Sequence, residues 1–136
     1  MARPSLRSTL DRAIGEINDD LLRMHKLGDQ AIGRAVDSLK RRDLATAQQV
    51  IDEDIHVNDL RYKIEEDCLA LIATQQPAAS DLRSIIAAMH MVVEMERMGD
   101  HATGIATTVI RIGDEPLLKP LVDIPRMAEL AREMLR

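Results

Sequence analysis

The sequence has almost no aromatic side chains: it contains no Phe and no Trp, and Tyr62 is its single Tyr. The core of this 136-residue chain must therefore be built from Leu, Ile, Val, Ala and the eight Met residues. Gly is also scarce, with six residues, while Leu, Ala, Glu and Arg are common. This composition predicts an all-α protein, and the length is that of one domain.

Cysteines and long apolar runs are missing as well. Cys68 stands alone, which excludes an internal disulfide and a cysteine-rich zinc site, and its apolar neighbours predict a core residue. The most apolar run, residues 85–93, is interrupted by His90 and is too short to cross a membrane. The N-terminal residues lack the apolar segment of a secretory signal. We therefore expect a cytoplasmic protein without direct membrane insertion.

The chain also has no excess of positive charge: its formal net charge is −5. A general nucleic-acid binder needs a basic face, so this balance argues against one and favours a cation or a basic partner. The sequence has no Gly-rich phosphate loop, no G-x-S-x-G motif and no recognisable nucleophile arrangement. We expect no enzymatic activity.

Apolar residues recur at spacings of three and four along most of the chain, which predicts long amphipathic helices. The first covers about residues 5–40, and the second covers about 44–74 with Asp43 as its N-cap. The third ends near residue 112, before Gly113. Because the connections are short, these helices must pack as antiparallel neighbours in an elongated three-helix bundle.

The end of the chain repeats part of its beginning. Residues 20–27 align without gaps to residues 123–130, with identical Asp, Arg, Met and Leu. A repeat of this kind predicts one three-helix unit at residues 1–113, followed at 114–136 by a linker and the first helix of a second, truncated unit. A single unit leaves an apolar face uncovered, so we also expect self-association, with a homodimer as the simplest form.

The third helix carries acids where apolar residues are expected. At 100° per residue, one apolar stripe of this helix consists of Leu82, Ile86, Met89 and Val93. The next two positions of the stripe are Glu96 and Asp100, so two acids continue a seam that we predict to be buried. An unpaired buried carboxylate is costly, and a cation must compensate it.

The second helix carries a matching polar pair, Asp54 and Asn58. Asp54 and Asp100 lie equally far from the turn at Pro77, so antiparallel packing places them at similar heights. We therefore predict a metal site made of Asp54, Asn58, Glu96 and Asp100, whose oxygen ligands suit Mg, Ca, Mn or iron. The alternative is a metal-free polar network in which arginines neutralise the acids: Arg61, Arg83, Arg97 or Arg111.

One motif points to a different function. Glu53-x-x-His56 matches half of the ligand set of a di-iron carboxylate bundle, which needs two such motifs and two further Glu. None of His25, His90 and His101 has a Glu three residues before it. A di-iron enzyme and a plain helical interaction module without metal are therefore the two alternative functions.

Two segments resemble motifs of the PhoU family of phosphate-signalling proteins. They are Gln76-Pro77-Ala78-Ala79-Ser80-Asp81-Leu82-Arg83 and Glu96-Arg97-Met98-Gly99-Asp100-His101-Ala102. The resemblance extends over residues 6–136 and implies two similar three-helix repeats, the second mostly absent here. It also implies acidic E/D-x-x-x-D motifs that hold metal ions. Glu96 and Asp100 match one motif, and Asp54 matches the other except for the amide of Asn58.

The resemblance implies a cytoplasmic regulator that dampens phosphate uptake and the phosphate-starvation response. Its implied partners are the ATPase of the phosphate transporter and a sensor histidine kinase. Its implied cofactor is a metal ion, iron foremost, with Mg, Mn and Zn as alternatives. Gly104 departs from the family pattern, which has Asn at this position.

Overall fold

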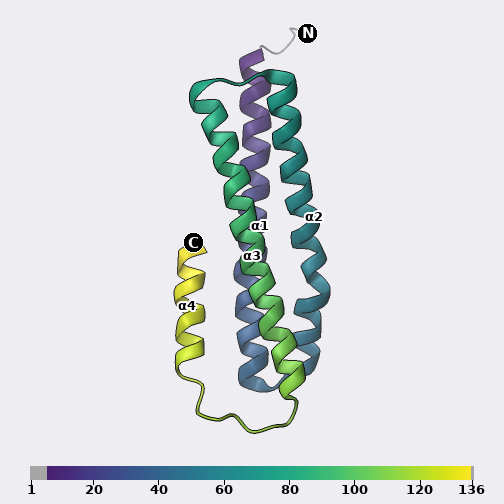
Figure 1. Cartoon of the computed structure of the whole chain (residues 1–136), viewed down its shortest axis with the longest axis vertical. Helices are drawn as coiled ribbons and strands as arrows, with labels where there is room; N and C mark the ends of the chain where they lie inside the picture. The colour runs from purple at the N-terminus through teal and green to yellow at the C-terminus, as the bar shows by residue number, and fades with distance from the viewer. Residues whose placement is uncertain (1–5, 136) are drawn as a thin grey trace.

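The chain forms three long helices side by side and a shorter fourth helix (Figure 1). The structure is a computed structural model that describes residues 6–135. The helices are α1 (Leu6–Arg41), α2 (Leu44–Gln75), α3 (Ala79–Ile112) and α4 (Asp123–Leu135). The predicted all-α class and the elongated antiparallel bundle are both confirmed.

Local chemistry sets the helix ends close to their predicted positions. Asp43 caps α2, because its Oδ1 accepts a hydrogen bond from the backbone N–H of Thr46 at 3.1 Å. Gly113 ends α3 at a positive φ of 56°, a conformation that costs glycine little, and its N–H donates to the carbonyl of Val109. Arg42, which lies between α1 and α2, links them to the end of α3, because its Nη1 donates a hydrogen bond to the Gly113 carbonyl at 2.9 Å.

The core consists of two apolar clusters stacked along the bundle. One joins the N-terminal half of α1 to the α2–α3 turn region, and the other joins the base of the bundle to α4. Cys68 lies fully buried in the first cluster, as its sequence environment predicts. The apolar spacing predicted along the first helix is confirmed by a stripe of buried residues on α1: Leu10, Ile17, Leu21, Met24 and Ala35.

The buried stripe predicted for α3 is wrong. Ile86 and Val93 are 42% and 39% exposed. The residues of α3 that are buried are Ile85, Ala88, Val92, Gly99, Ala102, Ala106 and Val109. Four of these seven are Ala or Gly, which lets α3 approach α1 and α2 closely, whereas Ile86 and Val93 lie on its flank. Glu96 and Asp100 therefore lie beside the core, and Asp100 is exposed.

Helix α4 packs alongside α1, after a proline-containing connection (Figure 1). Arg132 Nε lies 2.7 Å from Asp29 Oδ1, and Leu135 reaches Gly28 on the same face of α1. The division of the chain into a repeat at residues 1–113 and the start of a second at 114–136 stays a prediction. Among residues 6–135, no helix combines the length and the hydropathy that a bilayer crossing requires.

Candidate cation site and the groove between α1 and α2

The structure brings the acids of α2 and α3 together. Burial raises the pKa of Asp54, and the negative charges of Asp100 and then Glu96 raise it further, while a hydrogen bond with Thr103 opposes the shift. Gly99 of α3 faces Asp54 at this point, because a Cβ at that position would lie 3.4 Å from Asp54 Oδ1. Asn58 is half-buried one turn after Asp54. Three carboxylates thus share one face of the α2–α3 pair.

Glu96 already has a cationic partner. Its Oε2 accepts a hydrogen bond from Arg61 Nη1 at 2.5 Å, and the Arg61 Nε–H donates to Glu65 Oε1 at 2.9 Å. These bonds, first to Glu65 and then to Glu96, raise the pKa of the Arg61 guanidinium. Of the arginines considered from the sequence, Arg61 is therefore the one that neutralises a predicted site residue, whereas Arg97 pairs with Glu94.

The donor atoms of this cluster suit a hard cation, but the arrangement of the side chains does not. Asp54, Glu96 and Asp100 offer carboxylate oxygens and Asn58 an amide oxygen, which are ligands for Mg, Mn or iron. Within the part of the chain that the structure describes, however, no three His, Cys, Asp or Glu side chains are arranged to hold a metal ion. Glu96 is turned toward Arg61 instead. A bound metal would have to compete with this ion pair.

The two residues of the Glu53-x-x-His56 half-motif contact different parts of the molecule. Glu53 forms an ion pair with Arg34 of α1, which also hydrogen-bonds Gln49. His56 lies in a separate groove between α1 and α2, and His101 is exposed. No observation favours the di-iron alternative.

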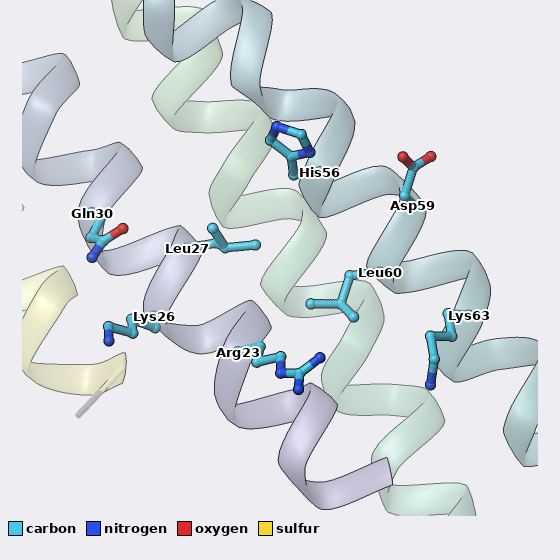
Figure 2. Close-up of a pocket in the computed structure, with 8 residues that line it drawn as sticks. All are labelled: Arg23, Lys26, Leu27, Gln30, His56, Asp59, Leu60 and Lys63. Carbon is cyan, nitrogen blue, oxygen red and sulfur yellow. The ribbon is translucent and has the colours of Figure 1, made fainter. Parts of the chain in front are cut away.

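That groove has a volume of about 420 Å³ and lies between α1 and α2 (Figure 2). Leu27 and Leu60 project into the space between the two helices, and polar and charged side chains surround them. Four of these side chains are basic, Arg23 and Lys26 on α1 and His56 and Lys63 on α2, and one, Asp59 on α2, is acidic. The groove therefore has an apolar floor and a mainly basic rim on a chain whose net charge is negative.

A buried carboxylate beside this groove was missed from the sequence. Asp20 is 4% exposed, and its oxygens accept from Lys63 Nζ at 2.6 Å and Arg23 Nη1 at 3.5 Å. Lys63 also donates to Asp67 at 2.9 Å, and the bonds to Asp20 and Asp67 raise its pKa. The available signal was the position of Asp20 inside the apolar stripe of α1, which required a cation from a neighbouring helix.

Together these features define an elongated α-helical bundle with an acidic cluster on α2 and α3 and a basic-rimmed groove between α1 and α2. Comparison with known protein families matches residues 21–109 to the PhoU domain. This chain belongs to the PhoU family.

Curated relatives are similar in sequence over most of this chain. A phosphate-specific transport system accessory protein PhoU homolog of Aquifex aeolicus is 38% identical over 125 residues, which cover 92% of this chain and 57% of that protein. The homolog of Pseudomonas putida is 36% identical, with 89% of this chain and 48% of that protein covered. This chain thus spans between about half and three-fifths of the length of these relatives.

Solved structures confirm the fold. PhoU from Pseudomonas aeruginosa superimposes with a TM-score of 0.87 at 31% identity, covering 92% of this chain and 60% of that chain. The phosphate transport system regulatory protein PhoU from Streptococcus pneumoniae gives 0.84 at 30% identity, covering 93% and 59%.

Proposed function

We propose that this chain is a cytoplasmic regulator of a phosphate transport system, and that it restrains phosphate uptake and the phosphate-starvation response without catalysing a reaction. The supporting observation is the match of residues 21–109 to the PhoU domain. Relatives aligned over most of this chain are named as accessory proteins of phosphate-specific transport. The chain is shorter than these relatives, so the function of the whole relative is carried over here as a proposal.

The proposed partners are the ATPase of the phosphate transporter and a sensor histidine kinase. Three long helices offer extended surfaces for such contacts, and the groove between α1 and α2 adds an apolar floor with a basic rim. A partner segment with apolar and acidic side chains would match this groove in both properties.

Recovery of these partners from cells tests the proposal. The chain, carrying an affinity tag, is isolated from cells grown with abundant phosphate and from cells starved of it. We expect the transporter ATPase and the kinase to accompany the chain, with more recovered when phosphate is abundant and uptake must be restrained. The tagged variant Lys26→Glu reverses one charge of the groove rim, leaves the Lys63–Asp20 pair intact, and should recover less of both partners. Absence of both partners in both growth conditions would contradict the proposal.

We propose in addition that Asp54, Asn58, Glu96 and Asp100 hold a metal ion, iron foremost, with Mg, Mn and Zn as alternatives. The support is the oxygen donor set and the excess of negative charge around Asp54. A bound cation would neutralise these acids and link α2 to α3. The ion pair between Arg61 and Glu96 favours the alternative of a metal-free helical interaction module, in which arginine compensates the acids.

Metal content distinguishes these two possibilities. Elemental analysis compares the wild type with the double variant Asp54→Asn, Asp100→Asn, after equilibration with each metal and removal of the free ion. We expect metal in the wild type, loss in the double variant, and tighter binding in Arg61→Ala, which frees Glu96. Glu94→Gln changes an exposed acid of α3 and serves as the matched control, which should bind metal like the wild type. Equal, negligible metal in wild type and double variant would support the metal-free module.

A further inference from the structure

The surface of α2 that faces away from the bundle carries three large apolar side chains. Ile55, Tyr62 and Leu69 are 58%, 62% and 57% exposed. They follow each other at intervals of seven residues, so they form one line along the helix, about 21 Å long. Tyr62 is also the single aromatic residue of the sequence. We call this line the α2 stripe.

The buried face of α2 has the same seven-residue pattern. Val57, Ile64 and Leu71 are 4%, 0% and 6% exposed. Each follows a member of the α2 stripe by two residues, which places it on the opposite side of the helix. One apolar row therefore packs in the bundle, and an equal row faces outward. Single exposed apolar residues are common on proteins, but a second row at helical spacing is typical of a face that contacts another element.

The α2 stripe is additional to the packing that folds the bundle. Helix α2 already contacts both α1 and α3 through its buried face. Within residues 6–135, α4 packs on α1 alone and makes no contact with α2 (Figure 1). No element that the structure describes therefore covers the α2 stripe, and a partner must come from outside the bundle.

Acidic side chains lie on both sides of the α2 stripe. Asp59 and Glu66, again seven residues apart, are exposed on one flank. Neither has a hydrogen bond or an ion pair with any other residue that the structure describes. Glu65 lies on the other flank, where Arg61 compensates its charge. The stripe is therefore bordered by uncompensated negative charge.

This charge indicates the kind of partner that fits. A second copy of the chain fits poorly, because two α2 stripes in contact would bring acids together in either orientation, and an anionic lipid surface would be repelled as well. A helix with apolar residues at seven-residue spacing and Lys or Arg beside them would cover the stripe and neutralise Asp59 and Glu66. Tyr62 supplies the residue type that often dominates the binding energy of an interface.

We propose that the outer face of α2 docks a basic amphipathic helix of another protein, with Tyr62 at the centre of the contact and Asp59 and Glu66 paired with the cations of that helix. The α2 stripe is a different surface from the apolar floor of the groove between α1 and α2. The inference does not depend on the proposed role in phosphate regulation. One helix on this face forms a small interface, so the binding is reversible.

A synthetic helical peptide of about three heptads tests the docking. It has Leu at every seventh position, Lys at the positions beside each Leu and Ala elsewhere, and fluorescence anisotropy gives its Kd for the 136-residue chain. We expect the wild type to bind, and Tyr62→Ser and Leu69→Ser each to raise the Kd by about tenfold or more. Leu22→Ser is the matched control, because it removes an apolar side chain of α1 that is 66% exposed, and it should leave the Kd unchanged.

Charge reversal tests the role of the two acids. Asp59→Lys with Glu66→Lys should weaken binding of the Lys peptide by about tenfold or more, because like charges then face each other. Glu94→Lys with Glu115→Lys makes the same change in net charge at exposed positions outside α2 and should leave the Kd close to the wild-type value. Circular dichroism of each variant establishes that the helices are retained.

Three results would overturn the proposal. The first is a wild type that does not bind the peptide. The second is equal weakening by both charge variants, or by Tyr62→Ser and Leu22→Ser, because the attraction would then be general and not local to the α2 stripe. The third is self-association that Tyr62→Ser removes in sedimentation equilibrium, which would assign the stripe to a second copy of the chain.

Discussion

At the scale of single residues, Asp54 is held in an unfavourable environment. Burial and the charges of Asp100 and Glu96 raise the pKa of Asp54 above its ordinary value of about 3.9. The folded protein therefore binds this proton more tightly than the unfolded chain does. Stability contributed by protonated Asp54 is lost as pH rises from about 4 through the raised pKa of the folded state.

We predict that Asp54→Asn stabilises the metal-free protein near neutral pH. The gain should be a few tenths of a kcal/mol to about 1 kcal/mol, since solvent screens a half-buried group. Urea unfolding in the presence of a chelator measures it, and the gain should shrink below about pH 4, where Asp54 is protonated in both states. A gain that is the same at pH 3 and pH 7 would show that charge is not its cause.

Asp20 presents the opposite case, because its buried carboxylate is well paired. We predict that Lys63→Ala lowers the free energy of unfolding by about 1–3 kcal/mol, since Asp20 keeps only the longer contact with Arg23. Lys26→Ala, at the rim of the same groove, is the matched control and should change stability by less than about 0.5 kcal/mol. Equal effects of the two changes in chemical denaturation would argue against a structural role for the Asp20–Lys63 pair.

At the scale of the elements, α3 shows what hydrophobic periodicity can and cannot predict. Its existence, its length and its end at Gly113 follow from helical spacing and from a residue that adopts a positive φ. Its buried face does not, because Ala88, Gly99 and Ala102 give a weak signal beside Ile86 and Val93. Small residues are buried because another helix approaches them, and that approach is a tertiary property.

Two glycines of α3 test this packing. We predict that Gly104→Ala stabilises the protein by about 0.5–1 kcal/mol, because helical Ala is preferred to Gly and a Cβ there has open space. Gly99→Ala should give a smaller gain or a loss, since its new methyl group would lie 3.4 Å from both Asp54 Oδ1 and Val57 Cγ1. Thermal unfolding of both variants measures the difference, and equal shifts in Tm would contradict the close approach of α2 and α3.

The proximity of Asp54 to the acids of α3 was predicted from the sequence, but the ion pair formed by Glu96 was not. The antiparallel turn at Pro77 is enough to place Asp54 near Asp100, whose negative charge raises the pKa of Asp54. The contact of Arg61 with Glu96 depends on how two long side chains cross between helices. Neither helical spacing nor charge counting determines that contact, so the sequence left Arg61 among four possible partners.

At the scale of the whole molecule, the bundle carries an acid cluster on α2 and α3 and a groove between α1 and α2. The acid cluster, the groove and α4 lie on different helix pairs, so variants of one can be examined with the others intact. The proposed metal binding and the proposed partner binding can therefore be tested separately.

Phosphate uptake by living cells tests the central claim most directly. Initial uptake of radiolabelled phosphate at abundant external phosphate is compared between cells that lack this gene and the same cells expressing the chain. We predict that expression lowers uptake and represses a phosphate-starvation reporter. Unchanged uptake and an unchanged reporter, with the chain present and folded in the cells, would contradict the proposed role of the chain as a regulator of phosphate transport.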